Sequence, residues 1–103
     1  MNVKHYIKGK ILLFEITEDL DHHQTEKIRN RADYEIQRFM PERVIIDFKS
    51  VNFMDSAGIG LIIGRYKQVS AMGGKLELIN VSEKIKKIFD MAGILKIIPI
   101  VSI

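Results

Sequence analysis

The stretch RVIIDFKSVNFMDSAGIG, residues 43 to 60, contains a strand, a loop and the start of a helix in direct succession. Its first part, RVIIDF, is a continuous apolar run with β-branched residues, which is typical of a central strand covered on both faces. From Ser56 to about Met72, apolar residues recur at helical spacing. A buried strand followed at once by an apolar helix favours an α/β fold.

The N-terminal part of the chain has the pattern of a β-hairpin and one long helix. Alternating apolar and polar residues indicate a half-exposed strand, and apolar residues three or four apart indicate the helix. In chain order we expect a strand at residues 3 to 8, a turn at Lys8 and Gly9, a strand at 11 to 16, and a helix that runs to about Met40. Asp19 or Asp21 can cap this helix, and Pro41 ends it.

The C-terminal part continues the alternation of strands and helices. Gly73 and Gly74 end the helix that starts at Ser56, and Ser82 caps a shorter helix that Gly93 ends. The other expected elements are a strand at residues 75 to 80 and a short apolar strand around Ile97 and Ile98. The order predicts one domain, residues 1 to 103, with a mixed, mostly parallel sheet of about five strands, an N-terminal hairpin and three helices.

Parallel strands place their strand-to-helix loops at one edge of the sheet. The loop with Asp19 and Asp21, the loop with Asp55 and Ser56, and the loop at Ser82 should therefore lie at the same end of the molecule. We therefore expect the unusual stretch around Ser56 to lie at this edge, together with the aspartates of the first loop.

Composition narrows the class of protein. The 103 residues carry a net charge of +3 and include no cysteine, which excludes a disulfide framework and a thiolate metal site and suits a reducing cytoplasm. The apolar C-terminal tail is far shorter than a membrane span.

Lys84, Lys86 and Lys87 are interpreted as a solvated helix face, because no exposed aromatics are interleaved with them. The adjacent His22 and His23 would project about 100° apart on a helix, which does not suit a shared metal ion.

Ser56 and its neighbours admit three interpretations within the chain itself. Asp55 or Ser56 can cap the helix, but a cap leaves Gly58 and Gly60 unexplained, because glycine costs about 1 kcal/mol in a helix interior. A nucleophile elbow needs a glycine where Met54 stands, and it needs a general base that the pattern does not supply. A phosphate-binding loop needs a different spacing of glycines.

The fourth interpretation is a hydroxyl that is presented to another protein. An exposed Ser56 beside Ala57 and the bare Gly58 would let a partner approach closely. A phosphate on Ser56 would add a charge of about −1.5 to −2 next to Asp55, at a helix N-terminus that tolerates negative charge. The surface would change while the fold is kept, so this interpretation explains every unusual feature of the stretch.

Four segments resemble the anti-sigma-factor antagonists, the STAS domain family: LDHH at 20 to 23, FMDSAGIG at 53 to 60, GRYKQ at 64 to 68, and IKKIFDMAGILKII at 85 to 98. DSAG combined with GRYKQ and FDMAG is similar to the sporulation branch of that family. The resemblance implies a regulatory protein rather than an enzyme, with no cofactor and no metal. In that branch the unphosphorylated antagonist binds an anti-sigma factor that is also a serine kinase, and the sporulation sigma factor F is released.

The resemblance also implies roles for individual residues. The kinase uses ATP to phosphorylate the serine that matches Ser56, and a separate serine phosphatase restores it. A cytoplasmic protein without direct contact to nucleic acid or membrane is expected. The partner-binding residues would be Asp21, Asp55, Ser56, Ala57, Gly58 and Ile59.

Other functions stay open at this point. The chain can be a STAS module of another phospho-switch, such as a stress response, or more remotely a small serine hydrolase or a nucleotide-binding protein. The resemblance further implies a C-terminal helix beyond the last strand, and with the sequence ending at Ile103 that helix is either cut off by truncation or missing. We therefore expect the apolar tail to lack part of its cover.

Overall fold

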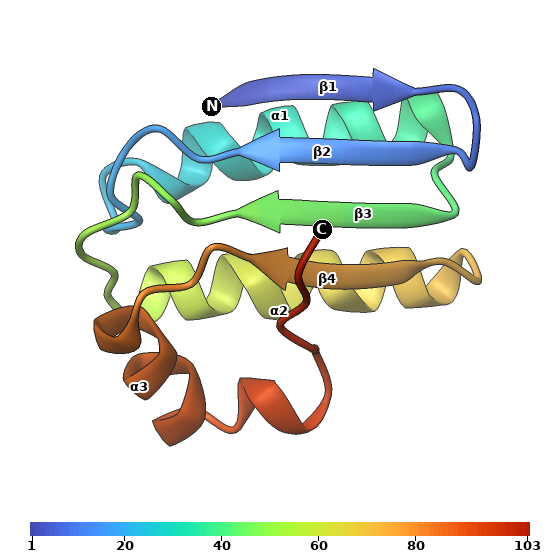
Figure 1. The fold of residues 1–103 in the computed structure, drawn as a ribbon. Helices are drawn as coiled ribbons and strands as arrows, with labels where there is room; N and C mark the ends of the chain where they lie inside the picture. The colour runs from blue at the N-terminus through green and yellow to red at the C-terminus, as the bar shows by residue number, and fades with distance from the viewer.

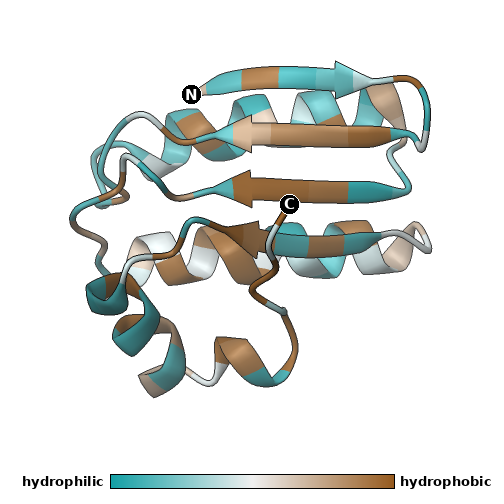
Figure 2. Ribbon diagram, in the orientation of Figure 1, coloured by the Kyte–Doolittle hydropathy of each residue, from teal (hydrophilic) through white to brown (hydrophobic).

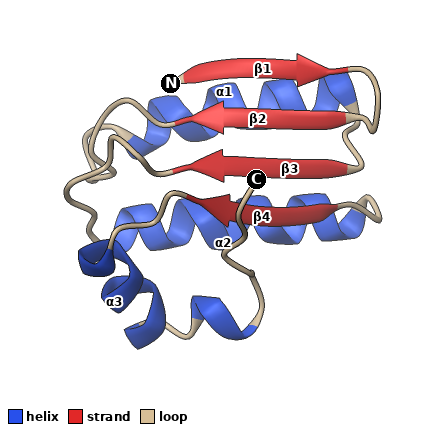
Figure 3. Cartoon of the chain, viewed as in Figure 1, coloured by secondary structure: helices blue, strands red, loops and turns tan.

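The computed structural model describes all 103 residues (Figure 1). In chain order the elements are β1 (Asn2–Tyr6), β2 (Ile11–Glu15), α1 (Thr25–Phe39), β3 (Arg43–Asp47), α2 (Ser56–Ala71), β4 (Lys75–Ile79), α3 (Glu83–Met91) and the 3-10 helix η1 (Ile94–Lys96). Strands and helices alternate after the first hairpin, as Figure 3 shows. None of the helices combines the length and the apolar character that crossing a membrane requires.

The four strands form one mixed sheet in the order β1-β2-β3-β4. β1 runs antiparallel to β2, whereas β2, β3 and β4 are mutually parallel, so the predicted hairpin and mostly parallel sheet are confirmed. The β3 strand lies between two parallel neighbours and its central residues Val44, Ile45 and Ile46 are buried, which explains its continuous apolar run.

The prediction of a fifth strand around Ile97 and Ile98 is wrong. Residues Ile94–Lys96 form the 3-10 helix instead, and the side chain of Ile98 is buried in the core. The tail pairs with β4 only through the bridge between Leu78 and Ile100. Pro99 has no N–H to donate to a longer ladder, so the pairing stops at the bonds of Leu78 with Pro99 and Val101.

The two faces of the sheet are covered differently. α1 and α2 lie behind the sheet in Figure 1, and the main core fills the space between them and the strands. On the other face a small cluster of Leu13, Ile45 and Ile79 packs with Val101 of the C-terminal segment. Figure 2 shows β3 with an apolar centre and polar ends. β3 is therefore covered on both faces as predicted, but by helices on one side and by the tail on the other.

The helix ends explain how the loops reach their places. Ser82 caps α3 as predicted, because its Oγ accepts a hydrogen bond from the N–H of Ile85 at 3.2 Å. Gly73 and Gly93 have positive φ angles of 78° and 75°, which only glycine adopts without strain. Phe89 of α3 meets Phe48, just beyond β3, edge to face with ring centroids 5.2 Å apart, and this contact docks α3 against the end of the sheet.

The start of α1 differs from the prediction. The helix begins at Thr25, and Gln24 at the N-cap position makes no side-chain hydrogen bond. Asp21 caps the turn before the helix instead, since its Oδ1 accepts from the N–H groups of His23 and Gln24 at 2.9 and 3.1 Å. A short polar side chain offers the backbone this local alternative to a helix. The loop after β2 is thereby lengthened and brings Asp21 toward the next loop.

A candidate partner-binding site around Ser56

Ser56 is the first residue of α2, and its side chain is exposed. The helix is capped by the preceding residue, since Asp55 Oδ1 accepts a hydrogen bond from the N–H of Ala57 at 2.9 Å. The side-chain hydrogen bonds of this corner are made by Asp55, and none involves the hydroxyl of Ser56. Because Asp55 satisfies the cap, the hydroxyl of Ser56 is free to react or to contact another molecule.

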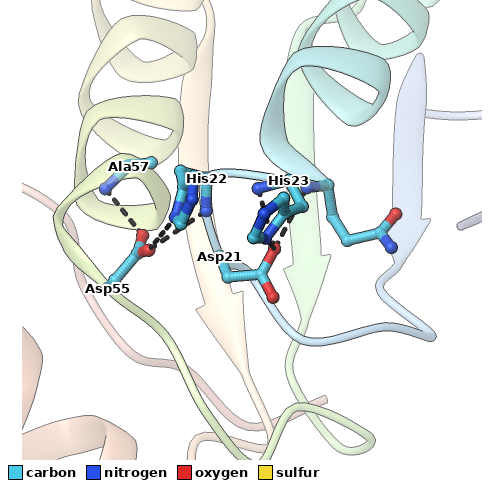
Figure 4. A network of polar contacts seen from close by, with 6 residues as sticks. Asp21, His22, His23, Asp55 and Ala57 are labelled. Atoms are coloured by element: carbon cyan, nitrogen blue, oxygen red, sulfur yellow. Dashed lines mark hydrogen bonds and ion pairs between the residues drawn. The ribbon is translucent and has the colours of Figure 1, made fainter.

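The loop that follows β2 lies against this corner. Asp55 Oδ2 accepts a hydrogen bond from the backbone N–H of His22 at 3.0 Å, and it lies 3.3 Å from Nδ1 of the His22 ring (Figure 4). Asp21 directly precedes His22 in this loop, and its carboxylate contacts the ring of His23. Asp21, Asp55 and Ser56 are therefore brought to the same edge, as the parallel strand order predicts.

Main-chain pairing joins the two loops beyond the ends of their strands. Leu20 pairs with Met54 in parallel, so the N–H of Leu20 bonds to the carbonyl of Phe53 and the N–H of Asp55 bonds to the carbonyl of Leu20. Asp19 Oδ1 accepts from the N–H groups of Asn52 and Phe53 at 2.9 and 3.2 Å. Asp19 is thus a clamp between the loops rather than a helix cap. The loop at Ser82 opens at the same end of the sheet (Figure 1).

The charge on Asp55 is stabilised where it stands. Partial removal from water would raise the pKa of Asp55, but hydrogen bonds from the ring and backbone of His22 and from the backbone of Ala57 and Gly58 outweigh this effect. The net result is a pKa of Asp55 below its usual value of 3.8. The carboxylate is therefore a fixed negative charge next to the Ser56 hydroxyl.

Gly58 does not offer a bare surface to a partner, and the sequence-based expectation that it lies on the binding surface is wrong. It is buried, and a β-carbon at this position would lie 2.3 Å from Cγ of Met54 and 2.8 Å from the carbonyl oxygen of Leu20. The glycine is needed inside the protein, where α2 passes close to the loop that follows β2. Gly60 differs, because it is exposed and a β-carbon there would meet no atom within 4 Å.

Two further predicted binding residues, Ala57 and Ile59, are only partly accessible. Ala57 is half-buried, and the half-buried side chain of Ile59 packs against the main core. Phe53, which the sequence reasoning did not single out, is 49% exposed at the tip of the loop before Asp55. Exposed aromatic side chains are enriched in protein–protein contacts. Its signal in the sequence was its place directly before the MDSAG motif.

A serine nucleophile is not assembled at this corner. The histidine ring beside Asp55 is the best candidate for a base, but His22 is 70% exposed and makes no hydrogen bond to Ser56. A general base must lie within hydrogen-bond reach of the proton that it removes. The corner therefore lacks a base in contact with the Ser56 hydroxyl.

The model of the STAS domain family matches residues 2–102. The chain belongs to the STAS domain family. This STAS domain is 37% identical over 90 residues to the anti-sigma F factor antagonist of Paenibacillus polymyxa, a match that covers 87% of this chain and 77% of the relative. It is 44% identical over 55 residues to the anti-sigma-B factor antagonist of Bacillus subtilis strain 168, which covers 53% of this chain and 50% of the relative.

Solved structures agree with this assignment. The anti-sigma factor antagonist SpoIIAA in its unphosphorylated form superposes with a TM-score of 0.82 at 27% identity, over 98% of this STAS domain and 87% of that chain. The phosphorylated form of Bacillus SpoIIAA gives a TM-score of 0.74 at 27% identity, over 98% of this chain and 90% of that one. These relatives are regulatory proteins, not enzymes.

Proposed function

We propose that this STAS domain is an anti-sigma factor antagonist. Its unphosphorylated form binds an anti-sigma factor that is also a serine kinase, and the sporulation sigma factor F is thereby released. The observation that carries the proposal is the exposed hydroxyl of Ser56, which stands unbonded at a corner that Asp55 already caps. The likeness to an anti-sigma F factor antagonist and to SpoIIAA, which has been solved with and without phosphate, supports it.

The chemistry of the switch follows from the corner. The kinase transfers the terminal phosphoryl group of ATP to Ser56 Oγ, the hydroxyl proton is lost, and ADP leaves. The phosphate adds a charge of about −1.5 to −2 beside Asp55, within a helix N-terminus that stabilises negative charge. The fold is kept, whereas a docked partner surface meets an uncompensated charge and is released. A separate serine phosphatase hydrolyses the ester and regenerates the binding form.

We assign partner contact to the exposed edge formed by both loops. Asp21 and Asp55 supply negative charge, Ser56 and Ala57 supply a surface without bulk, and Phe53 supplies apolar area. Ile59 contributes only the exposed part of its side chain. Gly58 acts indirectly, because its missing side chain lets α2 approach Leu20 and so sets the position of Ser56.

Transfer of labelled phosphate from ATP by the cognate anti-sigma factor tests this function. We expect the wild type and Ser50→Ala to accept phosphate and Ser56→Ala to accept none. Ser56→Ala should stay folded, with a change in the free energy of unfolding within about 0.5 kcal/mol, because Asp55 makes the cap. It should also bind the anti-sigma factor in titration calorimetry, whereas Ser56→Asp should bind weakly.

Two results would contradict the proposal. Phosphate incorporated into Ser56→Ala would move the site to another serine, with Ser50, Ser70 and Ser82 as the candidates. Equal affinity of the kinase for phosphorylated and unphosphorylated protein would exclude a charge switch even if Ser56 is the site.

A second candidate is a phospho-switch of the stress-response type. The similarity to the anti-sigma-B factor antagonist of Bacillus subtilis favours it over the matched segment, although that segment covers only 53% of this chain. The same calorimetric titration with an anti-sigma-B factor and an anti-sigma F factor decides between the two. Tighter binding of the anti-sigma-B factor would replace the sporulation assignment.

A further inference from the structure

A groove lies between the N-terminal halves of α1 and α2, next to the switch residue. It has a volume of about 290 Å³, and its lining residues are Thr25, Arg29, Ala57, Gly60 and Leu61. It starts beside Ala57, the residue that follows Ser56. Pockets for small-molecule ligands are usually about 300 to 1,000 Å³. This groove is slightly smaller than that range, so it suits one or two side chains of a partner better than a cofactor.

Gly60 keeps the groove open. It lies one helical turn after Ser56, on the same face of α2, and a β-carbon at this position would meet no atom within 4 Å. Unlike Gly58, it has no neighbour inside the protein that requires a missing side chain. Its bareness costs helix propensity without improving the packing of this chain. The open space is therefore available to an external group.

The wall of the groove carries a positive charge without a partner. Arg29 is exposed and belongs to none of the ion pairs of the protein. The nearby carboxylate of Asp33 is already engaged, because it lies 3.1 Å from Nε of Arg65. Burial lowers the pKa of Arg65, Asp33 raises it, and the positive charge of Arg29 lowers it again. Arg29 is therefore close enough to Arg65 to repel it, and only Arg65 is paired with a carboxylate, which favours a second anion at the groove.

We propose that this groove receives an acidic side chain, a glutamate or an aspartate, of the anti-sigma factor. Its carboxylate pairs with the guanidinium of Arg29, and its aliphatic stem lies over Gly60 and Ala57. This inference rests on the proposed function and adds to the acidic edge a contact of opposite charge. A partner carboxylate in this groove would also lie close to a phosphate on Ser56, so their repulsion would assist release.

Filling the groove tests the proposal by shape. In Gly60→Leu the new side chain occupies the groove, whereas Gly64→Leu is a matched control, because a β-carbon at Gly64 also meets no atom within 4 Å but Gly64 does not line the groove. Circular dichroism and thermal unfolding check that both variants are folded. We expect calorimetry with the anti-sigma factor to show an affinity at least about tenfold lower for Gly60→Leu and a change within about twofold for Gly64→Leu.

Reversing the charge tests the proposal independently of shape. Arg29→Glu should weaken binding by about tenfold at low salt, and the loss should shrink as salt is raised. Lys27→Glu makes the same charge change two residues earlier on α1, outside the groove, and should have little effect. If Gly60→Leu and Arg29→Glu both bind the anti-sigma factor as tightly as the wild type does, the groove contact is overturned and the proposed function still holds. Absence of binding by the folded wild type overturns the proposed function and this contact together.

Discussion

At the corner between β3 and α2, three residues meet three separate physical demands. Asp55 satisfies the backbone at the start of α2, Ser56 leaves its hydroxyl in solvent, and Gly58 makes room for Met54 and Leu20. Because Asp55 carries the cap, a substitution at Ser56 can alter binding with little effect on stability. Stability and surface chemistry are therefore carried by different residues at this corner.

Gly58 and Gly60 should respond oppositely to alanine. Gly58→Ala places a β-carbon against the backbone oxygen of Leu20, so we expect the free energy of unfolding to fall by about 1 to 3 kcal/mol. Gly60→Ala meets open space and should raise it by up to about 1 kcal/mol through helix propensity. Urea denaturation measures both changes. Equal effects of the two substitutions would contradict the assigned environments.

Acid should remove the contribution of Asp55. Its pKa is lower in the folded protein than the usual 3.8, so between the two pKa values the unfolded chain binds the proton and stability rises with pH. The stabilisation is therefore complete above the unfolded pKa and is lost as pH falls through the folded value. We expect urea midpoints of the wild type and Asp55→Asn, which keeps a capping oxygen, to differ at about pH 5 and to converge toward about pH 2. A gap that is constant across this range would show that the charge of Asp55 adds no stability.

At the scale of elements, the site is built by continuing the β2–β3 pairing into the loops. Leu20 and Met54 extend the parallel register, and Asp19 closes the gap by accepting from two N–H groups of the opposite loop. Two segments more than 30 residues apart in the chain are thereby fixed side by side. The position of Ser56 relative to Asp21 depends on this clamp.

Asp19→Ala should loosen the edge without removing a partner contact. Water can replace the lost acceptor at the exposed N–H groups, so we expect a loss of only about 1 kcal/mol in the free energy of unfolding. Amide exchange of Asn52 and Phe53 should accelerate, and affinity for the anti-sigma factor should fall. Hydrogen exchange followed by NMR, with calorimetry, measures both. Weaker binding with unchanged exchange would instead place Asp19 in the interface.

At the scale of the whole molecule, charge is distributed unevenly. The chain carries +3 overall, yet the edge around Ser56 presents the carboxylates of Asp21 and Asp55. Complementary charge at such an edge accelerates encounter with a partner and sets its orientation. The distribution predicts a basic partner surface opposite this edge, with an acidic group placed to reach Arg29.

Reversing Asp21 should weaken the complex while the fold is kept. Asp21→Lys raises the net charge by two, and Asp90→Lys on α3 makes the same change outside the two loops that form the edge. We expect slower association for Asp21→Lys, with a smaller deficit at high salt, and near wild-type association for Asp90→Lys. Surface plasmon resonance at two salt concentrations and circular dichroism make the comparison. Equal loss in both variants would indicate a response to net charge alone.

Local pattern determined the order of the elements and the place of the site. Apolar periodicity predicted the hairpin, β3, α2 and α3 within a few residues, because these elements bury one regular face. Parallel strand order predicted that the loops of Asp21 and Ser56 share one edge, since all parallel strands point the same way. The prediction of a fifth strand at Ile97 and Ile98 was wrong, because a short continuous apolar run has no periodicity that distinguishes a strand from a packed turn.

Tertiary structure alone decided which features face inward. Whether Gly58 is bare for a partner or for Leu20 depends on how closely α2 approaches a loop that precedes it by more than 30 residues. Whether Asp55 or Ser56 caps α2, and whether Arg29 has a counter-ion, depends in the same way on segments distant in the chain. Sequence periodicity encodes burial along one element, whereas a close approach between two elements is set by the packing of the whole core. The charge and shape of the surface around Ser56 therefore become defined only when the chain is folded.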